Sequence, residues 1–296
     1  MQRRTFLIGL GACVMPYSAI ARPAFGGEVL RDGVAKLDAE TGGRLGVAIR
    51  DHQSGARFAW RGDERFPMCS TFKALLGAAM LWRSERGIEQ LGRSVAIKAS
   101  DILPNSPFSE KRAGGTASVA ELCEATIALS DNLAANLLLD TMGGPAGLTR
   151  FIRRQGDAVT RLDRYELALN EARPGDPRDT TTPIAMVTFI ERLALGSTLS
   201  PASRERFIAW LMASQTGLKR LRGGIPADWK AGDKTGAGNR SDNDVAIFWP
   251  PGRKPIVVAS YIAGTTIEYP GSNAIHARLG ALIAMAVRNE AAIPSS

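Results

Sequence analysis

Apolar residues recur every three to four positions along most of the chain and every second position near its two ends. The first spacing indicates amphipathic helices, and the second, with β-branched and aromatic residues, indicates strands. We expect helices over residues 28–40, 71–86, 119–129, 132–141, 145–154, 183–195, 201–213 and 272–288. We expect strands over residues 45–50, 57–60, 229–235, 244–249 and 255–263.

This order of elements predicts an α/β (α+β) fold. Strands from both ends of the chain form one five-stranded antiparallel sheet, which the two terminal helices flank. The helical block is inserted between the strands. We therefore predict a sheet domain of residues 22–68 plus 214–296 and an all-helical domain of residues 69–213. The cleft between two such domains is a usual place for a functional site.

One segment of the helical block, residues 161–179, lacks helical periodicity. It carries many charges of both signs and two prolines. Connections of this length are usually functional or disordered. We expect Arg161 or Arg164 to pair with Asp179 and close the segment into an Ω-loop.

Composition narrows the class of function. The 296 residues are 45% hydrophobic and 22% charged, with a net charge of +8, as in an ordinary globular protein. The basic residues are spread along the chain, without a run of five and without zinc-finger spacing, so we expect no nucleic-acid partner. A basic surface can still draw small anions toward a cleft.

The N-terminus is typical of an export signal. Arg3 and Arg4 precede a short apolar stretch, and Ala19-Ile20-Ala21 is a small-x-small cleavage site. The paired arginines resemble a twin-arginine signal, so we expect residues 1–21 to direct the chain to the periplasm. The residues that end at Cys13 also resemble a lipoprotein cleavage box, so lipidation of Cys13 is an alternative. We expect no membrane association after the signal is removed, because no later segment has the apolar run of a membrane helix.

Metal binding has little support in the sequence. The two histidines, His52 and His276, are far apart and lack ligand-spaced companions, so we expect surface or packing roles for them and no metal or cofactor. We expect Cys69 and Cys123 to be free thiols.

Three short motifs carry candidate chemistry. In Ser70-Thr71-Phe72-Lys73 the lysine returns to the face of the serine, where it can reach and activate the hydroxyl. Ser130-Asp131-Asn132 offers a proton relay and an amide, although the same residue types also serve as helix N-caps. Lys234-Thr235-Gly236 offers a cation and a hydroxyl for a carboxylate, and we expect its glycine to let a ligand approach the strand, although an edge-strand lysine can equally discourage aggregation.

In this order and spacing, the three motifs resemble the serine β-lactamase and penicillin-binding protein superfamily. Glu166 through Asn170 resembles the element with which class A β-lactamases hold the hydrolytic water, and Arg164 and Asp179 match the ion pair that closes its loop. The resemblance implies a monomeric enzyme that opens β-lactam rings through a serine acyl-enzyme and so gives antibiotic resistance.

The resemblance also implies residue roles. Ser70 attacks the lactam carbonyl, Lys73 or Glu166 takes its proton, Ser130 protonates the leaving nitrogen, and Glu166 activates the water that cleaves the acyl-enzyme. The backbone N–H groups of Ser70 and Ala237 resemble an oxyanion hole. The residues that the resemblance assigns to substrate binding are Asn132, Asn170, Lys234, Thr235, Gly236, Ala237 and Arg220.

The chain departs from the family pattern at several positions. Asn243 stands where many members carry an arginine for the substrate carboxylate, and Arg220 resembles the substitute that some members use. Asn105 replaces a common aromatic gatekeeper at the mouth of the cleft. Gly238 excludes the disulfide that some carbapenem-hydrolysing members form with Cys69.

Two other functions share the three motifs. A carboxypeptidase or transpeptidase acting on cell-wall peptides generally lacks the loop glutamate, so Glu166 argues against it. A penicillin sensor that stays acylated usually hangs from membrane helices, which this sequence does not show.

Overall fold

A five-stranded antiparallel sheet forms the centre of the computed structural model, which describes residues 27–291. Its strands are β1 (Arg44–Asp51), β2 (Arg57–Trp60), β7 (Lys230–Gly238), β8 (Ser241–Trp249) and β9 (Ile256–Ala263). The order β2-β1-β9-β8-β7 pairs β1 with β9 and so joins the two ends of the chain. The predicted sheet is confirmed, and β7 is one of its two edge strands.

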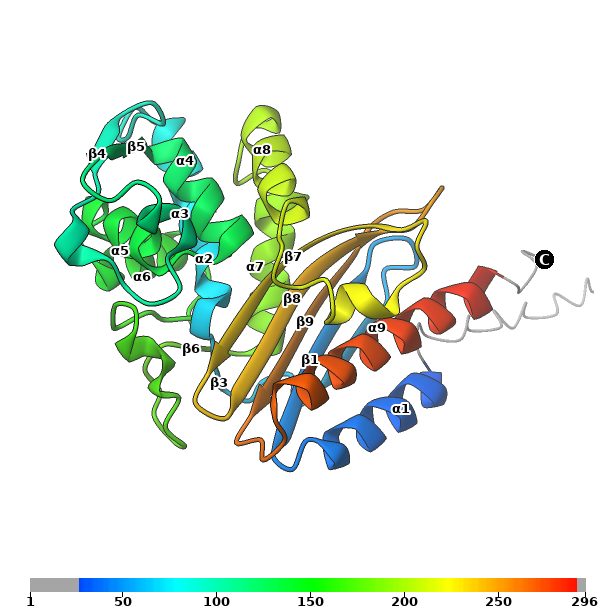
Figure 1. Cartoon of the computed structure of the whole chain (residues 1–296). Helices are drawn as coiled ribbons and strands as arrows, with labels where there is room; N and C mark the ends of the chain where they lie inside the picture. Colours follow the sequence, from blue (N-terminus) through cyan, green and yellow to red (C-terminus); the bar gives the residue numbers. More distant parts are fainter. Residues whose placement is uncertain (1–26, 292–296) are drawn as a thin grey trace, which may run out of the picture.

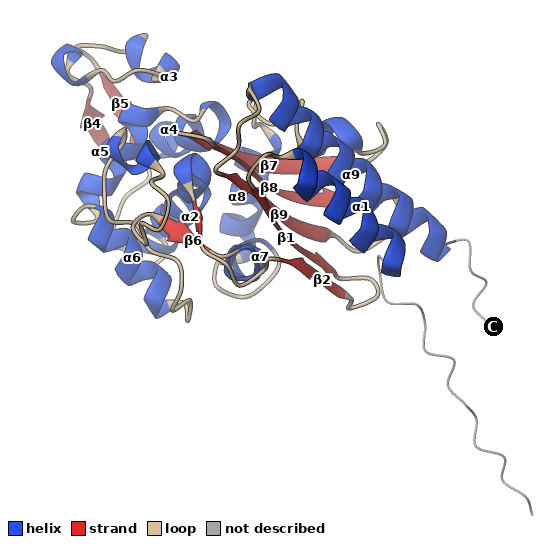
Figure 2. Cartoon of the chain, turned by 90° about the horizontal axis from the view of Figure 1, so that it is seen from below, coloured by secondary structure: helices blue, strands red, loops and turns tan. Residues whose placement is uncertain are grey.

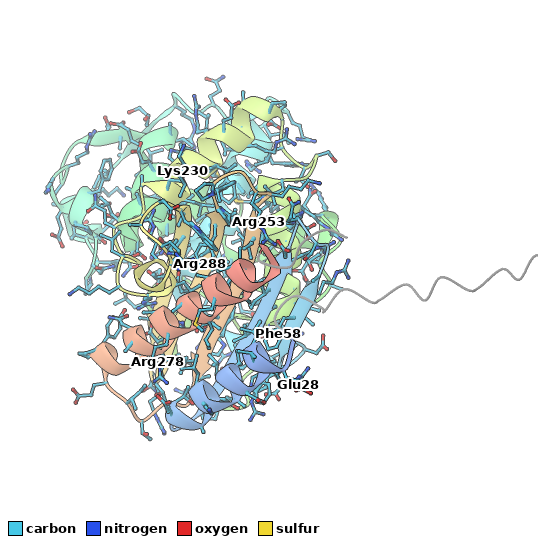
Figure 3. All side chains as sticks on the ribbon, turned by 90° about the vertical axis from the view of Figure 1, so that its right-hand side faces the viewer. Glu28, Phe58, Lys230, Arg253, Arg278 and Arg288 are labelled. Carbon is cyan, nitrogen blue, oxygen red and sulfur yellow. The ribbon has the colours of Figure 1, made fainter. Side chains whose placement is uncertain are left out.

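The terminal helices α1 (Gly27–Glu40) and α9 (Tyr269–Ala291) cover one face of the sheet, side by side. Leu30, Val34 and Leu37 follow helical spacing on α1 and are buried with inward residues of α9 and the strands. Figure 3 shows Glu28 on α1 and Arg278 on α9 from the outer side of this layer.

Helices α2 (Phe72–Ser84), α7 (Pro183–Ala194) and α8 (Pro201–Met212) pack toward the opposite face. Each face of the sheet has its own hydrophobic core, and alternate residues of a strand point into one or the other. Val245 and Ile247 pack with these helices, whereas Ala246 and Phe248 pack with α1 and α9. The rest of the helical block consists of α3 (Pro107–Glu110), α4 (Val119–Glu124), α5 (Asn132–Thr141) and α6 (Pro145–Arg154). The domain boundaries at residues 68/69 and 213/214 stay a prediction.

The structure contains elements that were not expected, among them the short helix α3. The helix expected over 119–129 is α4 followed by a π-helical segment, Ala125–Leu129, which ends at Ser130 in the left-handed conformation. Two small sheets also pair β3 (Phe66–Pro67) with β6 (Thr180–Thr181) and β4 (Ser94–Ala96) with β5 (Thr116–Ser118). Strands of two or three residues are too short to produce a period-two pattern.

No helix between residues 27 and 291 is long and apolar enough to cross a membrane. The predicted export signal, residues 1–21, and Cys13 lie outside the described residues. Cys69 and Cys123 are both free and buried, as predicted.

His276 on α9 is fully buried against the sheet. Its Nδ1 lies 2.9 Å from Ser260 Oγ on β9, and its Nε2 has no hydrogen-bond partner among the described residues. Burial, with the nearby positive charge of Arg220, lowers the pKa of His276 from 6.5 to about 3. The imidazole is therefore a neutral packing residue in the folded state.

Replacing His276 with Asn should make stability less sensitive to acid. In the unfolded parent, the imidazole binds a proton below about pH 6.5, whereas in the folded parent it binds one only below about pH 3. The folded state therefore loses stability relative to the unfolded state as the pH falls from about 6.5 to about 3. One such proton contributes at most about 1.4 kcal/mol per pH unit. Urea unfolding at pH 7 and pH 5 measures the difference, with His52→Asn as the control. Equal pH slopes for parent and His276→Asn would contradict the assignment.

Candidate active site

Ser70 lies in a 3-10 turn, Cys69–Thr71, that leads directly into α2. The turn packs beside β7, and only 9% of Ser70 is exposed. Its hydroxyl donates a hydrogen bond to Glu166 Oε1 at 3.1 Å. Two residues that are 96 positions apart in sequence are therefore in direct contact.

Gly236 and Gly238 allow this close approach of β7. A Cβ on Gly236 would lie 2.6 Å from the carbonyl oxygen of Met68 and 3.1 Å from the backbone nitrogen of Ser70. A Cβ on Gly238 would lie 2.7 Å from Cys69 Sγ. The missing side chain of Gly236 therefore lets the strand pack against the serine turn, and the expected approach of a ligand to the strand stays a prediction.

Lys73 is fully buried, one helical turn after Ser70. Its Nζ donates to Asn132 Oδ1 at 2.6 Å and to the Ser130 carbonyl at 2.9 Å, and it lies 2.9 Å from Glu166 Oε1. Within the described chain it bonds with these groups rather than with the Ser70 hydroxyl, which we expected it to reach. Burial lowers the pKa of Lys73, and the neighbouring Glu166 charge opposes that shift.

Ser130 stands between two lysines. Its Oγ accepts a hydrogen bond from Lys234 Nζ at 3.0 Å and a longer one from Lys73 Nζ at 3.5 Å. Lys234 is fully buried, and burial together with the charge of Lys73 holds its pKa well below the usual value. A hydroxyl in this position can exchange a proton with either lysine.

Asp131 and Asn132 divide the two roles that the sequence left open. Asp131 is the N-cap of α5, and its carboxylate accepts from Ala134 N and from two groups of Ser109. The capping interpretation therefore holds for Asp131. Asn132 instead donates to the Pro104 carbonyl at 2.8 Å and accepts from Lys73, so its amide lies at the site.

Glu166 is held by two asparagines. Asn170 Nδ2 donates to its Oε2 at 2.6 Å, and Asn170 Oδ1 is buried without a partner among the described residues. Asn136 clamps the backbone, because its Oδ1 accepts from Glu166 N at 3.0 Å and its Nδ2 donates to Glu166 O at 2.9 Å. We did not single out Asn136 from the sequence. Its one signal is its position four residues after Asn132 on the same helical face.

The loop that carries Glu166 is closed by ion pairs. Arg164 Nε lies 2.6 Å from Asp179 Oδ2, and Asp179 Oδ1 accepts from the backbone nitrogens of Asp163 and Arg164. Of the two arginines considered for this pairing, Arg161 instead pairs with Asp163. The pairing of β3 with β6 ties the end of the same loop to the segment that enters Ser70.

The Lys-Thr-Gly motif runs along the edge strand. Thr235 Oγ1 lies 2.6 Å from Thr216 Oγ1, and Lys234 Nζ donates to the Thr235 carbonyl at 2.8 Å. Ala237 follows, half-buried at the end of β7. The motif therefore lines the side of the site opposite Ser130 and α5.

Arg220 lies behind this strand, with only 1% of its surface exposed. It donates to the carbonyls of Gly236 and Asn243 and to Asn273 Oδ1. It also donates to the Tyr269 hydroxyl, and its Nη2 lies 2.5 Å from Asp242 Oδ1. All three nitrogens of the guanidinium are thus engaged by protein groups, and the expected role of Arg220 toward the substrate carboxylate stays a prediction.

The site as a whole combines a hydroxyl, a carboxylate and two buried lysines. The carboxylate of Glu166 is within hydrogen-bonding distance of both Ser70 and Lys73. Such an arrangement can generate a serine nucleophile and can stabilise negative charge that develops on a substrate. It is the constellation of an acyl-transfer enzyme.

Comparisons with known proteins agree with this chemistry. Residues 29–287 match the model of the beta-lactamase enzyme family. The carbapenem-hydrolyzing beta-lactamase KPC of Klebsiella oxytoca is 46% identical over 243 residues, 81% of this chain and 83% of its own length. The beta-lactamase CTX-M-8 of Citrobacter amalonaticus is 45% identical over 229 residues, 77% of this chain and 79% of its own.

Solved structures give the same result. An ancestral (GNCA) class A beta-lactamase superposes with a TM-score of 0.85 at 55% identity, covering 86% of this chain and 98% of its own. The chain therefore belongs to the beta-lactamase enzyme family, in class A. It is a hydrolase that opens the cyclic amide of β-lactam antibiotics and gives resistance to them.

Proposed function

We propose that hydrolysis proceeds through acylation of Ser70 and that Glu166 serves both halves of the reaction. The observation that carries the proposal is the Glu166 carboxylate, whose Oε1 accepts from Ser70 Oγ at 3.1 Å. In acylation the carboxylate takes the hydroxyl proton while the oxygen attacks the lactam carbonyl. Lys73 binds the same carboxylate oxygen at 2.9 Å and offsets its charge.

Ser130 is proposed to deliver a proton to the lactam nitrogen as the ring opens. Its hydroxyl accepts from Lys234 and Lys73, so a lysine proton can replace the one that it donates. The lowered pKa values of both lysines support this role, because a less basic ammonium group gives up its proton more readily. The oxyanion would be bound by the backbone N–H groups of Ser70 and Ala237.

Deacylation is proposed to use a water held by Glu166 and Asn170. Asn170 donates one amide hydrogen to Glu166 Oε2, and its buried carbonyl oxygen has no partner among the described residues. Before this step, the proton that Glu166 took from Ser70 passes to Lys73, whose Nζ lies 2.9 Å from Oε1 and which gave up its own proton through Ser130. The Asn170 oxygen can then accept a hydrogen bond from the attacking water, while the restored Glu166 carboxylate removes the other proton of that water. Closure of the loop by the Arg164–Asp179 ion pair would hold the Glu166 carboxylate in position next to Ser70.

Two parts of the substrate are proposed to bind to opposite sides of the site, one at β7 and the other at the start of α5. Lys234 and Thr235 on β7 bind the ring carboxylate, with Gly236 and Ala237 as the adjoining strand backbone. Asn132 on the opposite wall binds the acylamide side chain. Arg220 acts from behind, because its bond to the Gly236 carbonyl fixes the strand and adds positive charge beneath it.

Replacing Glu166 with Ala should slow deacylation far more than acylation. Without the carboxylate charge, which raises its pKa, the buried Lys73 favours the neutral amine and can take the Ser70 proton in its place. The variant should accumulate a stable acyl-enzyme with a penicillin, visible by intact-protein mass spectrometry, because the water loses its base. Its steady-state kcat should fall by at least about 100-fold. Glu205→Ala, an exposed glutamate on α8, is the matched control, and Ser70→Ala should form no adduct. Normal turnover by the Glu166 variant would refute the deacylation role.

Replacing Arg220 with Ala should raise KM for carboxylate-bearing substrates about tenfold while kcat changes less, because the strand that binds the carboxylate loses a support and a nearby charge. Unfolding free energy should also fall by about 3 kcal/mol, since Asp242 remains buried without its cation. Arg206→Ala on the α8 surface controls for loss of charge. Unchanged KM in a folded variant would reject the role.

We also propose that the enzyme acts as a monomer in the periplasm after export by the twin-arginine route. The paired arginines at positions 3 and 4 and the small-x-small site at 19–21 support this route.

Replacing Arg3 and Arg4 with Lys should remove activity from the periplasmic fraction while activity persists in the cytoplasmic fraction, because a twin-arginine signal is read through that pair. Cell fractionation and a chromogenic cephalosporin assay measure the ratio. Arg22→Lys, beyond the predicted cleavage site, is the control. Export of the double variant at the parental level would argue for a different route.

A further inference from the structure

A second cavity lies in the helical block, away from Ser70. It occupies about 190 Å³ and is lined by residues of the end of α2, of the segment after α5 and of α6. Trp82 on α2 is twelve residues beyond Ser70, which corresponds to about 18 Å along a helix. The cavity is therefore separate from the hydrolytic site, although one helix connects the two.

Three arginines line this cavity: Arg83, Arg150 and Arg154. Within residues 27–291 none of them forms an ion pair with a carboxylate, whereas nearby Arg86 pairs with Glu85. Arg150 and Arg154 are one turn apart on α6, and like charges at this spacing repel each other. An anion bound between them would remove that repulsion.

The Arg83 guanidinium is held in place by the backbone but is only partly hydrogen-bonded. Its Nη2 donates to the Thr141 carbonyl at 3.1 Å, which fixes the guanidinium at the wall of the cavity. Its Nε is buried and has no hydrogen-bond partner among the described residues. Of the five N–H donors of the guanidinium, the Thr141 carbonyl therefore uses one, which leaves other donors of this fixed group for an anion.

The remaining lining is apolar and aromatic. Trp82 and Phe151 pack edge to face with ring centroids 5.5 Å apart, and Met142 completes the wall. Phe151 is 4% exposed, so the floor is a fixed part of the core. A ligand for this cavity therefore needs a compact apolar body next to its negative charge.

We propose that this cavity binds small aromatic carboxylates. The ring lies against Trp82, Phe151 and Met142, and the carboxylate lies among the three guanidinium groups, which bind carboxylates through paired N–H donors. The cavity is smaller than the usual site for a drug-sized molecule, which favours a single ring. Benzoate is the corresponding probe, with an expected Kd on the order of 1 mM for a ligand of this size.

The experiment titrates benzoate into the full enzyme in low-chloride buffer and follows the indole N–H resonance of Trp82, assigned with Trp82→Phe. Benzoate should shift this resonance saturably, and benzyl alcohol, which lacks the charge, should bind at least about tenfold more weakly. Arg150→Gln/Arg154→Gln should weaken benzoate by a similar factor. The control with the same loss of charge is Arg57→Gln/Arg206→Gln, which should bind like the parent.

A parallel assay separates this cavity from the hydrolytic site. At concentrations that saturate the Trp82 signal, benzoate should leave KM for a chromogenic cephalosporin unchanged, because it does not compete at Ser70. Absence of a saturable shift, equal binding of benzyl alcohol, or equal binding by the Arg150/Arg154 variant would overturn the proposal. Loss of the Trp82 shift when the hydrolytic site is acylated would also overturn it, by placing benzoate in that site.

Discussion

The ion pair between Lys73 and Glu166 is the interaction on which the site depends. Both side chains are fully removed from solvent, and their charged atoms are 2.9 Å apart. Burying one such charge without its partner is strongly unfavourable, so each requires the other and the hydrogen bonds around them. The protein supplies those bonds with neutral groups: Asn132 and the Ser130 carbonyl for the lysine, and Asn170 for the carboxylate.

This pair also explains why so much of the fold converges on a few atoms. Glu166 belongs to a loop, and loops are the least restrained part of most folds. Here the Arg164–Asp179 pair closes the loop, the β3–β6 pairing joins it to the serine segment, and Asn136 clamps its backbone. These three interactions therefore restrain the position of the Glu166 carboxylate.

Charge is buried behind the strand as well as in front of it. Arg220 and Asp242 form a pair with almost no exposure, and the Arg220 side chain bridges β7, β8 and the start of α9. Replacing such a pair with apolar residues often leaves stability unchanged or improves it. Retaining it is easier to understand from function, since it brings a cation close to the strand that carries Lys234 and Thr235.

Much of this architecture followed from local pattern. The five strands and the main helices come from hydrophobic periodicity, which depends only on neighbouring residues and on which face they bury. The three motifs and the loop glutamate carried the resemblance to class A, and family and fold are now established by the comparisons.

Other features were decided only when distant segments came together. The sequence suggests that Lys73 can reach Ser70, but the folded chain gives Lys73 the partners Glu166, Asn132 and Ser130. The sequence does not indicate that a side chain at position 236 would collide with the Met68 carbonyl. It also does not indicate that Asn136 binds the backbone of Glu166. Periodicity records which face of an element is buried, whereas the partner of a buried polar group depends on three-dimensional packing between residues far apart in the chain. The sequence by itself therefore determined the elements and the chemical groups, and the tertiary structure decided which of those groups meet.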